Sequence, residues 1–152
     1  MRNVKRIPVY LKYFSDFAVL SKFLNTTDKN IIDPIWKNWK HICDFWLENP
    51  DLRFGQLLCN LRLIPNLNIE NRIWNVEEDN WLVDNNYINL EDIKYWGVNF
   101  YKNGKQRKKT KYVLLRDLKT DHIVNIIKFF EGRLHIIPMR YLQYFNKKIE
   151  NE

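Results

Sequence analysis

Apolar residues recur at intervals of three and four along the N-terminal part of the chain, which is the spacing of helices with one buried face. The stripes predict three helices, over residues 8–24, 34–48 and 52–61. Each follows a helix-start signal: Pro8, the Asp33-Pro34 pair and Asp51. Gly55 costs the third helix about 1 kcal/mol relative to alanine, which indicates a close approach to another helix. We favour plain helical packing of this segment over a helix-turn-helix, because it offers few polar side chains for DNA.

The pattern is weaker between residues 66 and 90. Ile73-Trp74 could form a short strand, and Asn75 could cap a short helix over residues 77–82. The polar run Asp84-Asn85-Asn86 is typical of a loop. We therefore expect a helical module over residues 1–86 and a second module over residues 87–152, unless the two form one compact domain.

Two β-prone runs, at residues 94–101 and 111–116, flank a basic segment in the second module. The turn signal Asn103-Gly104 between them predicts a hairpin with a long, projecting loop over residues 102–111.

Two helices are predicted after the hairpin. The first is capped by Asp117 or Thr120 and ends near Gly132, where a left-handed residue is expected. The second starts at Pro138, after a short extended run at residues 135–137, with Met139, Leu142 and Phe145 turned inward. The predicted fold class is therefore α+β and mostly helical, with an N-terminal helical bundle followed by a β-hairpin and two packing helices.

Positive charge is concentrated in the predicted loop over residues 102–111. The chain carries a formal charge of +7, and all but one unit of it is supplied by six residues of the predicted loop. These are Lys102, Lys105, Arg107, Lys108, Lys109 and Lys111. Such a segment attracts phosphate groups through counterion release and electrostatic steering. An acidic protein partner and a loop that only aids solubility remain alternatives.

Two further features point to the same ligand chemistry. Tyr101 and Tyr112 flank the basic segment and are candidates for stacking on bases. Arg116, Lys119 and His122 surround the start of the following helix, where free N–H groups favour a phosphate. A local role for His122 in the helix cap is the alternative. The tryptophans outside the hairpin, at positions 36, 39, 46, 74 and 81, are expected in the core.

The sequence offers no catalytic pattern. Cys43 and Cys59 lie on apolar stripes, so we expect buried, reduced thiols, and His41 and Cys43 lack the spacing of zinc ligands. Four scattered glycines cannot build a phosphate loop. The acidic run Glu77-Glu78-Asp79 is typical of a solvated first helical turn. We therefore expect a non-enzyme without metal or cofactor, and no apolar run is long enough to span a membrane.

Two strings resemble segments of known proteins. ENPDLRFGQLLCNL, at residues 48–61, resembles a segment of small bacterial and phage proteins of unknown function that continue to an acidic stretch, here NVEEDNWL at residues 75–82. LLRDLKTDHIVNIIKFF, at residues 114–130, resembles the strand-to-helix segment of other short phage and prophage proteins. The resemblance implies a phage or mobile-element accessory protein and carries no catalytic residues with it.

The expected function is binding of nucleic acid, or of a nucleic-acid-containing host complex, in the cytoplasm. One alternative is an inhibitor that docks on a host defence protein, as anti-CRISPR proteins do. Another is a protein that sequesters a small nucleotide near His122.

Overall fold

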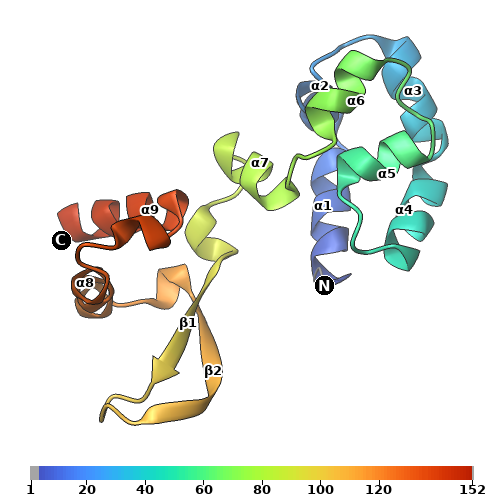
Figure 1. Cartoon of the computed structure of the whole chain (residues 1–152). Helices are drawn as coiled ribbons and strands as arrows, with labels where there is room; N and C mark the ends of the chain where they lie inside the picture. The colour runs from blue at the N-terminus through green and yellow to red at the C-terminus, as the bar shows by residue number, and fades with distance from the viewer. Residues whose placement is uncertain (1–3, 152) are drawn as a thin grey trace. The chain divides into compact units, whose positions relative to one another are not determined.

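The computed structural model describes residues 4–151, which form two compact units (Figure 1). One unit ends at Trp81 and the other begins at Leu82. Helices dominate both, and within the described residues two strands pair as an antiparallel hairpin. This confirms the predicted α+β, mostly helical class. No helix in residues 4–151 combines the length and apolar character that crossing a membrane requires.

The first unit consists of short helices. They are α1 (Ile7–Phe14), α2 (Phe17–Leu24), α3 (Lys29–Lys37), α4 (Trp39–Glu48), α5 (Phe54–Asn60) and α6 (Leu67–Ile73), with a 3-10 turn at Val4–Arg6. Helix α7 (Glu78–Asp84) begins in this unit and ends in the next.

The prediction of a single helix over residues 8–24 is wrong, because one helix ends at Phe14 and a new one begins at Phe17. Asp16 adopts an extended conformation, and its carboxylate accepts hydrogen bonds from the N–H groups of Ala18 and Val19 at 2.8 and 3.2 Å. This is the geometry of an N-cap, and it starts a new helix. The apolar stripe continues across the break, so periodicity alone did not reveal it.

The second predicted helix begins and breaks at other places than expected. It starts at Lys29, where the Asp28 carboxylate accepts from Asn30 N at 2.9 Å, so the Asp33-Pro34 pair lies inside it. It breaks at Asn38, whose side-chain amide donates to the Pro34 carbonyl at 2.7 Å. A side chain that binds the backbone in this way competes with helix continuation.

Two predictions around α5 and α6 are also wrong. Asp51 is not the N-cap of α5, which begins after Arg53. The buried N–H of Phe54, the first residue of α5, donates to the Glu78 carboxylate instead. Ile73 ends helix α6 and forms no strand, because Asn66 caps that helix by accepting from Ile69 N at 2.9 Å.

Aromatic rings build the core of the first unit. Phe14, Trp46 and Phe54 are fully buried, and Phe54 stacks on Phe14 at 4.3 Å and on Trp46 at 5.4 Å between ring centroids. Trp46 also donates its ring N–H to the Leu52 carbonyl at 2.9 Å. Trp74 is 41% exposed, which contradicts its predicted place in the core.

The second unit carries the hairpin and the helices α8 and α9. Its elements are a 3-10 turn at Leu90–Asp92, β1 (Tyr95–Phe100), β2 (Gln106–Leu114), a 3-10 turn at Leu115–Asp117, α8 (Thr120–Phe129), a 3-10 turn at Leu134–Ile136 and α9 (Met139–Glu150). Its buried core consists of Leu90, Leu115, Leu118, Ile123, Ile126, Ile137 and Phe145.

The structure corrects several details of this unit. Neither predicted residue caps α8: Lys119 precedes the helix, and the Thr120 hydroxyl is buried without a hydrogen-bond partner among the described residues. Residues 134–136 form a 3-10 turn where an extended run was predicted. Met139 is 67% exposed, because it lies in the first turn of α9 and faces away from the core. Gly132 has φ +80°, as predicted for a left-handed residue after α8.

Candidate functional site

The basic segment is mostly a strand, which corrects the predicted loop over residues 102–111. Strand β2 extends from Gln106 to Leu114, so Arg107 to Lys111 belong to the ribbon. The connection is a tight turn in which Tyr101 N donates to the Lys105 carbonyl at 2.8 Å and Gly104 has φ +84°. The cationic side chains therefore project from an ordered ribbon.

Trp96 anchors the ribbon to the helices of its unit. Its ring lies 5.5 Å from Phe145, 6.3 Å from Phe130 and 6.3 Å from Tyr141, measured between centroids. Beyond this contact the hairpin extends away from α8 and α9 (Figure 1).

The register of the strands assigns side chains to the two faces of the ribbon. Trp96 pairs with Val113, and both pack on the core of the unit. Gly97 pairs with Tyr112, so the Tyr112 ring lies on the opposite face, because neighbouring residues of a strand alternate. Tyr95 shares that face by the same alternation. Tyr95 and Tyr112 are 53% and 69% exposed.

The distal end of the ribbon is irregular. The register shifts between Val98 and Phe100, which leaves extra residues on β2. The guanidinium carbon of Arg107 lies 4.2 Å from the centroid of the Tyr101 ring, a cation–π contact. Arg107 Nε is buried and has no acceptor among the described residues. One face of Tyr101 is therefore covered from within the protein.

The ribbon carries one sign of charge. No Asp or Glu lies between Asp92 and Asp117 in the sequence, and the six basic residues of the segment all fall in this interval. In the described part of the chain, none of the six pairs with a carboxylate. Apart from the half-buried Arg107, all are exposed to solvent. Their charge is thus available to an external anion.

A second feature is an open groove of about 540 Å³ at the start of α8. It is lined by Arg116, Asp117, Leu118, Lys119, Thr120, Asp121 and Lys148. The groove contains two of the three residues predicted around this helix start. His122 does not line it.

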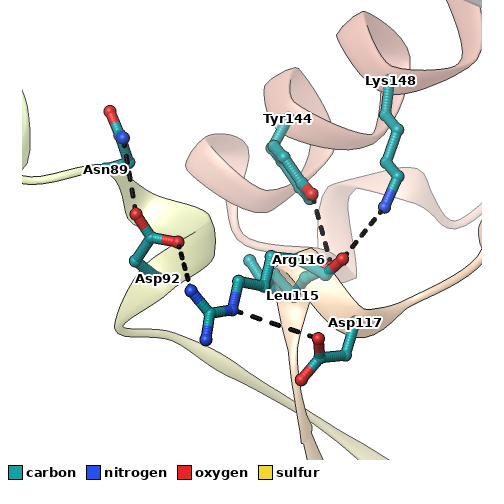
Figure 2. Close-up of polar contacts among 7 residues, drawn as sticks. All are labelled: Asn89, Asp92, Leu115, Arg116, Asp117, Tyr144 and Lys148. Atoms are coloured by element: carbon teal, nitrogen blue, oxygen red, sulfur yellow. Dashed lines mark hydrogen bonds and ion pairs between the residues drawn. The ribbon is translucent and has the colours of Figure 1, made fainter.

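The groove holds its own counterions (Figure 2). Arg116 Nη1 lies 3.3 Å from Asp92 Oδ1, and Arg116 Nε lies 4.0 Å from Asp117 Oδ1. Two carboxylates therefore balance the charge of Arg116 locally. The Asp121 carboxylate occupies the helix start itself, where it accepts from His122 N at 3.0 Å. These acidic groups make the groove a weaker anion site than the ribbon.

Lys148 and Tyr144 fasten the turn beneath this groove to α9 (Figure 2). As Figure 2 shows, Lys148 Nζ donates to the Arg116 carbonyl at 3.4 Å, and Tyr144 donates to the Leu115 carbonyl at 3.3 Å. Lys148 Nζ also donates to the Leu118 carbonyl at 2.5 Å. Burial raises the pKa of Tyr144, and the nearby carboxylates, Asp92 and Asp117 among them, act in the same direction. The hydroxyl therefore remains a donor at neutral pH.

Sequence reasoning missed some exposed rings and one lysine. Tyr95 and Phe100 are exposed on the ribbon beside the predicted Tyr101 and Tyr112. The alternation around Trp96 could have indicated Tyr95, because a core-facing tryptophan sends its neighbour outward. Lys148 comes next to Leu118 through the packing of α9, which no local pattern indicates.

No group of three or more His, Cys, Asp or Glu side chains in residues 4–151 is arranged to hold a metal ion. Comparisons with protein-family models, with curated proteins and with solved structures each returned no match to the chain.

Proposed function

We propose that the protein binds nucleic acid through its β-hairpin, without catalysing a reaction. The observation that carries this proposal is the ribbon from Tyr95 to Leu114, which holds six cations, no carboxylate and several exposed rings. Cations that are not paired with a carboxylate release the condensed counterions of a phosphate backbone when they bind it. Aromatic rings on the same ribbon add contacts to bases.

The groove at the start of α8 has a secondary place in this proposal. Lys119 is exposed and has no carboxylate within ion-pair distance in the described chain, so it can contact a phosphate. Arg116 is a weaker candidate because Asp92 pairs with its side chain, and His122 because the Asp121 carboxylate already accepts from its backbone N–H.

The resemblance of residues 48–61 and 114–130 to phage proteins favours host interference as the setting. In that setting the ligand is nucleic acid of the host or of a host nucleoprotein complex. A protein inhibitor that docks by shape would instead retain its partner after nuclease treatment. A pull-down from host lysate, with and without nuclease, separates these two functions.

The direct test replaces Lys105, Arg107, Lys108 and Lys109 together by glutamine. The matched control replaces four exposed lysines outside the hairpin, at positions 29, 37, 40 and 128, so that both variants lose the same charge. We expect the hairpin variant to lose roughly 100-fold or more in affinity at low salt, and its salt slope to fall by about 3–4. The control should retain most of its affinity. Binding that survives both high salt and the hairpin substitutions would refute the proposal.

A further inference from the structure

We propose that the ribbon face carrying Tyr95 and Tyr112 stacks unpaired bases, so that the preferred ligand is single-stranded nucleic acid. This inference rests on the proposed function and names its substrate class. It concerns a different surface from the Tyr101 ring, one face of which Arg107 already covers.

The Tyr112 ring lies against the ribbon beside Gly97. A Cβ atom built on Gly97 would lie 3.5 and 3.9 Å from Cε1 and Cδ1 of Tyr112. The ring edge therefore lies over the glycine of the neighbouring strand and follows the surface of the ribbon. Because it is 69% exposed, the ring offers a broad face to solvent.

The other residues of this face extend the same surface. Tyr95 lies on it two residue pairs closer to the base of the ribbon than Tyr112, and is also more than half exposed. On the distal side, the Thr110 hydroxyl donates to Asn99 Oδ1 at 2.6 Å, which joins the two strands across the face. The surface is thus two rings beside a short polar pair, opposite the side where Trp96 packs.

Ring faces distinguish unpaired from paired bases. In a duplex, base faces are stacked inside and only their edges reach the grooves, where donors and acceptors read them. A tyrosine that lies along the ribbon is not a wedge that could separate base pairs. Unpaired bases expose their faces, and stacking on tyrosine is sequence-tolerant.

The charges fit the same ligand. Lys111 pairs with Val98 and lies on the face opposite Tyr112, and the further basic residues follow toward the tip. A ribbon of two strands is only about 5 Å wide between strand axes, so long lysine side chains reach past its edges. Phosphates of a strand whose bases stack on the tyrosines can therefore meet cations at the ribbon edges and the tip.

The test measures fluorescence anisotropy with a labelled 12-nucleotide DNA, the RNA of the same sequence and the corresponding DNA duplex. We expect both single strands to bind roughly tenfold or more tightly than the duplex. Tyr112→Leu and Tyr95→Leu should each weaken single-strand binding about tenfold with an unchanged salt slope. Tyr112→Phe should retain affinity, and Phe129→Leu serves as the control for an exposed ring outside the hairpin.

Photo-crosslinking keeps the test independent of how well the variants fold. A 5-iodouracil oligonucleotide should crosslink to Tyr112 or Tyr95 of the unaltered protein. Equal affinity for duplex and single strands, or crosslinks only outside this face, would overturn the inference while leaving nucleic-acid binding intact. Loss of binding to all three ligands would instead overturn the proposed function. A difference between the DNA and RNA single strands would show which sugar is preferred.

Discussion

Gly55 and Ile73 bring two helix backbones into contact. A Cβ atom on Gly55 would lie 2.1 Å from the Ile73 carbonyl oxygen, far inside van der Waals contact. Helices α5 and α6 therefore pack at a distance that only glycine permits, which confirms the close approach predicted from its place in a helical pattern. The backbone carbonyl cannot rotate away as a side chain could, so the contact must be kept free of any side chain.

Gly55→Ala should consequently destabilise the first unit. An exposed helical glycine gains about 1 kcal/mol when replaced by alanine, but here overpacking should reverse the sign and cost about 1–3 kcal/mol. Urea denaturation followed by circular dichroism measures the change. Asn60→Ala, at an exposed position of the same helix, should stay within about 0.5 kcal/mol of the unaltered protein. A stabilised Gly55→Ala variant would contradict the close packing.

Glu78 is expected to stabilise the first unit from inside. Its side chain is fully buried, and Oε1 accepts a hydrogen bond from Phe54 N, the first residue of α5, at 2.5 Å. Glu78→Leu leaves that buried N–H without an acceptor and should cost about 1–3 kcal/mol in the free energy of unfolding. Glu78→Gln keeps a carbonyl oxygen at the site and should lose less. Equal losses in the two variants, measured by urea denaturation, would argue against a capping role.

Glu78 also shows where sequence reasoning ended. The acidic run at residues 77–79 was expected to be solvated, but Glu78 and Asp79 are buried. Asp79 lies 2.8 Å from Arg6, a residue 73 positions away in the chain. Tertiary packing brings Phe54 to Glu78 and Arg6 to Asp79. These partners are too far apart in the sequence for a local helical pattern to indicate them. The fold class follows from periodicity, because that signal is local.

The hairpin illustrates the same limit at the candidate site. Its two strands and the Asn103-Gly104 turn follow from β-prone residues and turn chemistry, which are local. The extent of β2 does not, because lysines have low strand propensity and the basic run was expected to be a loop. Pairing with β1 decides its conformation, and so decides which rings and cations share a face.

The two cysteines should differ in reactivity. Burial raises the pKa of Cys59 to about 11, and the Glu70 carboxylate acts in the same direction. Cys43 is only half-buried, which corrects its predicted burial, although its pKa is also raised. With Ellman's reagent at pH 8, Cys43 should react first and Cys59 only on unfolding, because the thiolate is the nucleophile. Cys43→Ser should remove the fast phase. Equal rates for the two thiols in the folded protein would contradict this assignment.

The Asp84–Arg140 pair predicts a weak acid sensitivity of the second unit. The hydrogen bond from Arg140 lowers the pKa of Asp84, burial opposes it, and the charge of Arg140 adds to the lowering. Because the folded-state pKa of Asp84 lies below the ordinary 3.8, the pair contributes fully above 3.8. Its contribution is lost as the pH falls from 3.8 through the lowered folded-state pKa. Because both side chains are about a third or more exposed, we expect less than about 1 kcal/mol.

Arg140→Met tests this pair. The variant should be slightly less stable than the unaltered protein at pH 7, and the difference should vanish as the pH falls well below 3.8. Lys147→Met, at an exposed position of the same helix, should show no such pH-dependent difference. Thermal unfolding at a series of pH values measures both. A difference that grows toward acid pH would have the wrong sign for a lowered carboxyl pKa.

Trp96 links the stability of the second unit to its proposed binding. The ring is half-buried and contacts Phe130, Tyr141 and Phe145, so Trp96→Ala should cost about 2–3 kcal/mol. It should also weaken nucleic-acid binding, although it lies on the face opposite Tyr112, because the ribbon loses the contact that orients it. Trp74→Ala, at an exposed ring of the first unit, controls for loss of a tryptophan. If Trp96→Ala destabilised the unit but bound single strands with full affinity, the ribbon would need no fixed orientation to act.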